Sequence, residues 1–187
     1  GNSSAKEGTG LYARILMEQN PLLPVEEDGR LCDPVLRENF VTRVFAYHDW
    51  LRLKSEGITK GKLIAFHSRY KYLLFAHQPA AYKALGKLLG DATELSLEQL
   101  SARYISGLMQ GLQQRVSRKN HTNVLQHLQG YFKKQLTASQ KAELHNTIDK
   151  YRRGLVPLMV PMTLIQHYLR EYPNPYLASQ VYLNPHP

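Results

Sequence analysis

The sequence predicts an all-α protein whose single globular domain contains about seven helices, because apolar residues recur at intervals of three and four along most of the chain. No run of alternating apolar residues competes with this helical spacing. Capping residues and prolines mark successive helix starts. The 187 residues, 43% of them hydrophobic and 21% charged, can bury one core without a metal or a disulfide.

Residues 1–30 are expected to be the tail and linker of a missing N-terminal domain, with the helical domain spanning 31–187. A short helical pattern from Gly8 to Glu18 precedes PLLPVEEDGRLCDP, whose prolines and Asp-Gly pair favour an extended connector. Charge marks the same boundary. Residues 1–30 hold three bases and five acids, whereas the whole chain has a net charge of +9 and a pI near 9.6.

The first long helix is predicted to begin after Asp33, which can cap it, with Pro34 at its first position. Gly57 is expected to end this helix just beyond Ser55. Its expected buried stripe consists of Leu36, Phe40, Val44, Tyr47 and Leu51.

Local signals also mark the later helices. A second helix should bury Leu63, Phe66, Tyr70, Leu73, Leu74 and His77. Ser96 and Gln99 form a capping-box pattern, and the helix they open is expected to run through Val116. Pro161 should make the first turn of the last long helix irregular. In chain order, the expected starts are Thr59, Pro79, Ser96, Asn120 or Thr122, Thr137 and Pro157.

Basic residues gather in two stretches without acids. Six bases lie between Glu56 and Asp91, and seven lie between Glu98 and Glu143. On ordered helices, such stretches indicate a surface that faces a polyanion. A basic surface that serves only solubility is the alternative.

Aromatic residues interleave with these bases, as in proteins that bind single-stranded nucleic acids. Tyr72 is expected to stack on bases, whereas Tyr70, Phe132 and Tyr151 fit core positions. The segment RVSRKNHTN predicts a phosphate site, because cations at a helix end precede a new helix start at Asn120–Thr122. The candidate nucleic-acid-binding residues are Arg69, Lys71, Tyr72, Arg115, Arg118, Lys119, His121, Thr122, Asn123, Lys133, Lys134, Arg152 and Arg153.

No catalytic or metal-binding residue is predicted. The chain lacks nucleotide-binding glycine motifs, a nucleophile elbow and a zinc-protease motif, and its one cysteine is Cys32. His77 and His127 are expected to be hydrogen-bonded core histidines. An alternative small-molecule pocket would be lined by His67, Lys71, His121 and Asn123. The single cysteine favours a reducing, cytoplasmic location.

Four strings, FHSRYKYLLFAHQPAAYKALGKLL, RKNHTNVLQHLQGYFKK, YRRGLVPLMVPMTLIQHYLREYPNPYLASQVYL and NPHP, resemble the YbgA-like domains of unknown function over residues 35–187. The segment from Glu7 to Phe40 is similar to the junction found when this domain follows a thiouracil-desulfidase-type domain. Matching motif positions are His67, Arg69, Lys71, His77, His121, Thr122, Asn123, His127, Tyr131, Tyr151, Arg152, Pro157 and Pro161.

The resemblance implies an accessory role, in which this domain binds a thiolated RNA, most plausibly tRNA, and presents it to the fused desulfidase domain. The iron–sulfur cluster of such enzymes would belong to the missing domain, so no cofactor is expected in this chain. Two alternatives remain: a structural or dimerising scaffold, which a large exposed apolar patch would favour, and a nucleobase-binding enzyme, which a deep polar pocket would favour.

Overall fold

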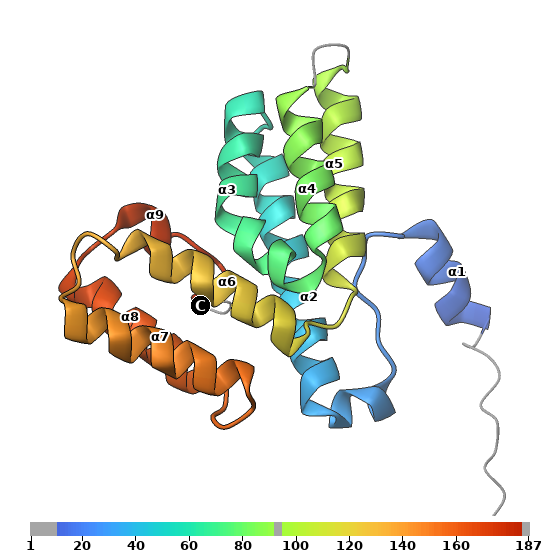
Figure 1. Cartoon of the computed structure of the whole chain (residues 1–187). Coiled ribbons are helices and arrows are strands. Elements are labelled where there is room, and N and C mark those ends of the chain that lie inside the picture. The colour runs from blue at the N-terminus through green and yellow to red at the C-terminus, as the bar shows by residue number, and fades with distance from the viewer. Residues whose placement is uncertain (1–10, 92–94, 185–187) are drawn as a thin grey trace, which may run out of the picture.

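The computed structural model describes residues 11–91 and 95–184, and within them all regular structure is helical (Figure 1). The all-α prediction is therefore confirmed. Seven helices, α2 to α8, correspond to the seven expected in the domain. The elements are α1 (Leu11–Gln19), the 3₁₀ helix η1 (Asp28–Cys32), α2 (Pro34–Ser55), α3 (Lys60–His77), α4 (Pro79–Gly90), α5 (Leu97–Leu112), α6 (Arg118–Tyr131), α7 (Ala138–Arg152), α8 (Met159–Glu171) and α9 (Pro175–Ala178).

Two groups of helices share one core. Helices α2 to α5 stand together as a bundle, and α6 to α8 lie across one end of it (Figure 1). Helix α3 joins the groups, because it contacts α4, α5 and α6. Helix α1 lies apart from the bundle, and no side chain from Ala13 to Cys32 is fully buried. None of the described helices combines the length and apolar character that crossing a membrane requires.

Most predicted caps are confirmed. Asp33 accepts hydrogen bonds from the backbone amides of Val35 and Leu36, and Thr59 accepts one from Lys62. Both bonds of a capping box are present at Ser96, and a second box forms at Thr137. Each cap satisfies an amide that the first helical turn would otherwise leave unpaired.

The predicted start of α6 is wrong. Helix α5 ends at Leu112, and α6 begins at Arg118 with Ser117 as its N-cap, which accepts from the Asn120 amide at 3.1 Å. Thr122 is buried inside the helix, and its hydroxyl donates to the carbonyl of Arg118 at 2.8 Å. The sequence pattern predicts that the preceding helix continues through Val116, and a cap at Ser117 is incompatible with that longer helix.

The predicted buried stripe of α2 is only partly confirmed: Leu36 is buried and Tyr47 packs partly buried against the core, but two other positions are exposed. Val44 is 39% exposed and Leu51 is 45% exposed, while Trp50 is 5% exposed and packs edge-on against Phe66 with ring centroids 5.7 Å apart. The core face consists of Leu36, Thr42, Arg43, Ala46 and Trp50. The buried guanidinium of Arg43 is paired with Glu26 of the N-terminal connector at 3.5 Å.

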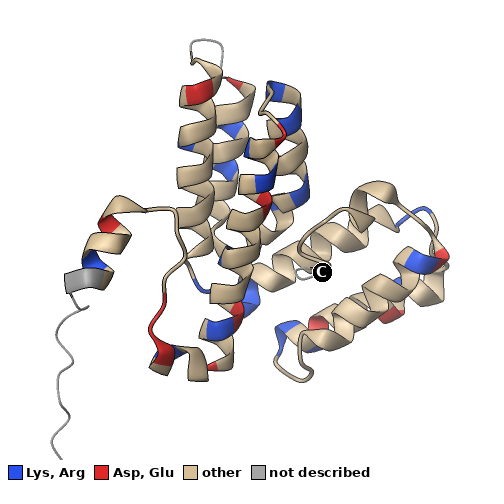
Figure 2. Cartoon of the chain, turned by 180° about the vertical axis from the view of Figure 1, so that it is seen from behind, with Lys and Arg blue, Asp and Glu red and all other residues tan. Residues whose placement is uncertain are grey.

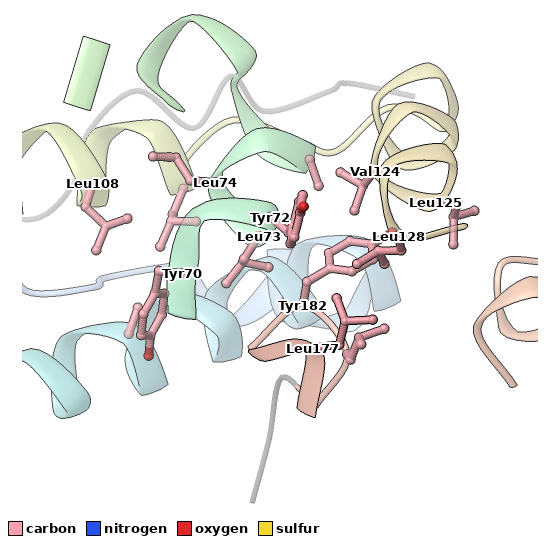
Figure 3. Packing of buried hydrophobic residues seen from close by; sticks show 14 of the residues in the cluster. Tyr70, Tyr72, Leu73, Leu74, Leu108, Val124, Leu125, Leu128, Leu177 and Tyr182 are labelled. Atoms are coloured by element: carbon pink, nitrogen blue, oxygen red, sulfur yellow. The ribbon is translucent and has the colours of Figure 1, made fainter. Parts of the chain in front are cut away.

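The C-terminal tail, residues 175–184, is part of the core. The side chain of Gln180 donates to the carbonyl of Ser68 at 2.9 Å, and the amide of Val181 donates to the carbonyl of Arg69 at 3.1 Å. Leu177 and Tyr182 belong to the same buried cluster as residues of α3 and α6 (Figure 3). The tail therefore fastens the two groups of helices together.

Candidate nucleic-acid interface

Helices α3, α4 and α6 contain no aspartate or glutamate. The described acidic residues lie instead on α1, on the connector before α2, on α2, α5, α7 and α8 and, as Glu56 and Asp91, directly after α2 and α4 (Figure 2). Glu7 and Glu94 lie outside the described residues. Because α3 contacts both α4 and α6, the three carboxylate-free helices are neighbours in space. Their eight bases are Lys60, Lys62, Arg69, Lys71, Lys83, Lys87, Arg118 and Lys119.

A hollow of about 470 Å³ lies between α3 and α4. Helix α3 contributes Ile64, His67, Ser68 and Lys71, whose spacing of three and four residues places them on one helix face. Helix α4 contributes Tyr82, Lys83, Gly86 and Lys87. Three lysines therefore border one hollow.

His67 forms part of the wall of this hollow. Its Nδ1 lies 3.3 Å from the hydroxyl oxygen of the fully buried Tyr104. Burial, together with the charge of Lys71, lowers the pKa of His67, so the imidazole is neutral at pH 7.

Lys71 is held by aromatic rings. Its Nζ lies 5.1 Å from the ring centre of Tyr72 and 4.9 Å from that of Tyr176. Burial alone would lower the pKa of Lys71, but the hydroxyls of Tyr176, Tyr131 and Tyr82 raise it overall. Lys71 is therefore a positioned cation, because cation–π contacts restrict its long side chain.

Two further hollows lie along α6, and Asn123 and Gln126 line both of them. One, of about 380 Å³, also includes Phe75 and His127. The other, of about 370 Å³, also includes Arg118, Lys119, Thr122 and Arg152. Ring contacts connect these hollows to the one beside α4. The ring centre of Phe75 lies 5.1 Å from that of Tyr82 and 5.4 Å from that of His127.

We call this surface the α3–α4–α6 face. It consists of His67, Lys71, Phe75, Tyr82, Lys83, Lys87, Arg118, Lys119, Asn123, Gln126, His127 and Arg152.

Arg118 also has a structural role. Its guanidinium donates to the carbonyl of Tyr151 at 3.3 Å and lies 5.5 Å from the centre of that ring. Gly154, with a φ of +81°, ends α7 beside it, and a Cβ at Gly154 would collide with Arg118 Nη1. The end of α7 thus fixes the position of this cation.

The structure brings some predicted residues together and separates others. Arg118, Lys119, Thr122, Asn123 and Arg152 border one hollow. The remaining bases lie elsewhere. Arg69 pairs with Asp49 of α2 at 3.2 Å, Arg153 pairs with Asp149, Arg115 lies in the connector before α6, and Lys133 and Lys134 follow the far end of α6.

Tyr72 is not a stacking residue. It is only 5% exposed, and its hydroxyl donates to the hydroxyl oxygen of Tyr131 at 3.1 Å. An isolated α3 would expose the side that carries Tyr72. That side is instead covered by α6 and the tail. Tyr70, Phe132 and Tyr151 are buried, as predicted.

The histidine predictions have mixed outcomes. His77 is buried, and its Nδ1 lies 2.6 Å from the carbonyl oxygen of Gln114, as expected. His127 was expected in the core but is exposed. Burial, with a smaller effect of His77, lowers the pKa of His121 to about 4, and its Nδ1 lies 2.8 Å from the hydroxyl oxygen of Tyr182.

The predicted four-residue pocket does not form. His67 and Lys71 line the hollow beside α4, whereas Asn123 lines the two hollows along α6, and His121 lines none of the three. His121 and Asn123 are two positions apart on a helix, so their side chains point in different directions.

Sequence reasoning missed Lys83 and Lys87 as site residues, together with Phe75 and Tyr82. A signal was present, because the two lysines are four residues apart on a helix without acids and therefore share a face. Within 11–91 and 95–184, no group of three or more histidine, cysteine or acidic side chains is arranged to hold a metal ion.

Comparisons with known proteins agree with the resemblance seen in the sequence. A family model described as a protein of unknown function, DUF1722, matches residues 71–187. The uncharacterized protein YbgA of Escherichia coli strain K12 is 36% identical over 146 residues, which cover 78% of this chain and 86% of YbgA. No solved structure matches. The family match and the similarity to YbgA show that this chain belongs to the DUF1722, or YbgA-like, family.

Proposed function

We propose that the chain binds RNA through the α3–α4–α6 face. The observation that carries the proposal is the absence of carboxylates from three neighbouring helices, which border two hollows lined by basic residues and a third, aromatic and polar one. Repulsion from acidic side chains would weaken phosphate binding, and here these helices contain none. A surface shaped only by solubility needs no such segregation of charge.

The chemistry of the face suits a folded or single-stranded RNA better than duplex DNA. Lysines and arginines can contact phosphates, while Phe75, Tyr82 and His127 offer ring edges and faces to unstacked bases. The hollows of the face are lined by residues from several helices, whereas a major groove is read by a single helix or β-ribbon inserted into it.

A narrower proposal names the RNA as a thiolated tRNA in the cytoplasm that this domain presents to a desulfidase-type domain in the same polypeptide. Only the resemblance of residues 7–40 to such a junction supports this part. The α3–α4–α6 face supports binding of RNA in general, and its chemistry does not depend on a thiolated base.

Binding of fluorescent tRNA at several salt concentrations tests the proposal. If four or five phosphates are contacted, the slope of log K against log salt should be roughly −3 to −4.5. Lys83→Gln/Lys87→Gln/Lys119→Gln should flatten this slope by about two to three units. The matched control, Lys54→Gln/Arg103→Gln/Lys141→Gln, removes the same charge from exposed positions on α2, α5 and α7 and should change the slope much less.

Equal losses in the two triple variants would attribute binding to net charge and remove the α3–α4–α6 face from the account. Unmeasurable binding of tRNA by the folded wild type would remove RNA altogether. Circular dichroism of each variant provides the folding control, since exposed charges of this kind contribute little stability.

One observation favours a second candidate, a dimerising scaffold. Val44 and Leu51 lie two turns apart on the outside of α2 and are 39% and 45% exposed. Sedimentation analysis of wild type and Val44→Gln/Leu51→Gln would test it. Self-association that only the α2 variant loses supports the scaffold, and a monomer at all concentrations contradicts it.

A further inference from the structure

The hollow between α3 and α4 is bordered by three lysines, an imidazole and a serine hydroxyl, and by no carboxylate. We propose that it binds a phosphate monoester, either the 5′-terminal phosphate of an RNA or a free phosphorylated ligand. The RNA-end form of this inference rests on the function proposed above, whereas the free-ligand form stands without it.

The wall formed by α3 is fixed in place before any ligand arrives. Lys71 is held between the rings of Tyr72 and Tyr176, with its Nζ within 5.1 Å of both ring centres. Such a cation loses little conformational freedom when it pairs with an anion, so more of the interaction contributes to affinity.

His67 is oriented as a donor. The hydroxyl of Tyr104 is buried and lies 3.3 Å from His67 Nδ1, and a buried donor without an acceptor is costly. Donation from Tyr104 to Nδ1 leaves the proton of the neutral imidazole on Nε2. That atom is on the side of Gly86, since a Cβ built on Gly86 would lie 4.0 Å from it.

The wall formed by α4 supplies two adjustable cations. Lys83 and Lys87 are exposed and four residues apart, and within the described part of the chain neither is in an ion pair. Gly86 lies between them and has no side chain. It therefore leaves His67 Nε2 accessible from the hollow.

This arrangement suits a monoester better than a phosphodiester. A phosphate monoester carries a charge of about −1.5 to −2 near pH 7 and offers three terminal oxygens. A backbone diester carries one charge and two such oxygens. The hollow, at about 470 Å³, exceeds the size of a phosphoryl group and leaves space for part of the group attached to it.

The test compares two fluorescent 12-nucleotide RNAs of one sequence, one with a 5′-phosphate and one with a 5′-hydroxyl. We expect wild type to prefer the 5′-phosphate by about tenfold, the contribution of one charge-assisted hydrogen bond. Gly86→Leu should abolish the preference by filling the hollow, and leucine is a good helix former, so the fold should persist. Lys83→Gln/Lys87→Gln should also abolish it, whereas Lys54→Gln/Arg103→Gln should keep it.

A second measurement separates the two sources of phosphate. Uridine 5′-monophosphate and inorganic phosphate are titrated while the NMR signals of the His67 ring are followed. Shifts in wild type that Gly86→Leu loses would support a free phosphorylated ligand, even if no RNA binds and the proposed function fails. The inference would be overturned if wild type shows no preference for the 5′-phosphate and neither phosphate compound shifts the His67 ring signals. If both RNAs still bind, with equal affinity, the proposed RNA-binding function would remain.

Discussion

Gly154→Ala should destabilise the protein in two ways, through backbone strain and through a collision with Arg118. Gly154 ends α7 in the left-handed region, where its amide donates to the carbonyl of Tyr151 and the next amide, of Leu155, donates to Lys150, each at 2.9 Å. This is the Schellman arrangement, which favours glycine. An alanine at φ +81° costs about 1–2 kcal/mol in backbone strain alone.

The new methyl group would also displace the guanidinium of Arg118. That movement breaks the 3.3 Å hydrogen bond to Tyr151 and the cation–π contact. Since Arg118 is exposed, we expect about 1 kcal/mol from these two contacts together. The total for Gly154→Ala is therefore about 2–3 kcal/mol, and a domain of this size loses about 2–4 °C in Tm per kcal/mol.

A double-mutant cycle with Arg118→Ala isolates the contact. Once Arg118 is truncated, Gly154→Ala should cost only the backbone strain, about 1–2 kcal/mol. Urea unfolding of the wild type, both single variants and the double variant, followed by circular dichroism, measures all four free energies of unfolding. The same cost of Gly154→Ala with and without Arg118 would refute the reasoning.

Three further predictions concern the interior. Tyr72→Phe should cost about 0.5–1.5 kcal/mol in urea unfolding and leave tRNA affinity unchanged, because its hydroxyl bonds Tyr131; a clear loss of affinity would show that Tyr72 reaches RNA. The folded-state pKa of His121 near 4 lies below its ordinary value, so its contribution to stability is complete above pH 6.5 and is lost as the pH falls toward 4. The free energy of unfolding of the wild type should therefore fall by about 2 kcal/mol between pH 7 and pH 5 because of this group, and His121→Phe should reduce that fall. The same pH dependence of unfolding in both proteins would contradict this prediction. Leu177→Ala, at a fully buried position of the tail, should cost about 2–5 kcal/mol in thermal or urea unfolding, whereas Leu155→Ala, at a position 61% exposed, should cost far less; equal costs would show that the tail is not part of the core.

The helices could be predicted from local sequence because their starts are coded by single residues. Asp33, Thr59, Ser96 and Thr137 cap the helices that each was predicted to open. The start of α6 is an exception, because Ser117 directly follows the stretch through Val116 that is predicted to belong to the preceding helix. Helices α4 and α8 begin without a side-chain cap.

The buried face of a helix was harder to predict than the helix itself. In α2, aliphatic and aromatic residues form a regular stripe in the sequence, yet the core side contains Arg43 and Trp50. Arg43 can be buried only because Glu26, from a connector outside the helix, supplies the opposite charge. Such a pairing depends on tertiary contacts that helical periodicity does not include.

The candidate site could be predicted in kind and only partly in detail. The acid-free stretches already contained Lys71, Lys83, Lys87 and Lys119. Their convergence required the packing of α3 against both α4 and α6. Tyr72 was misassigned for the same reason, because the tail covers a side of α3 that an isolated helix would expose.

Photo-crosslinking to tRNA that contains 4-thiouridine tests the central claim most directly, because peptide mapping locates RNA on the protein surface. The RNA-binding account predicts crosslinks in residues 71–87 and 118–131, at Phe75, Tyr82 or His127, with fewer in Lys83→Gln/Lys87→Gln/Lys119→Gln. Crosslinks confined to α2, α5 or α7, at unchanged yield in that variant, would contradict it.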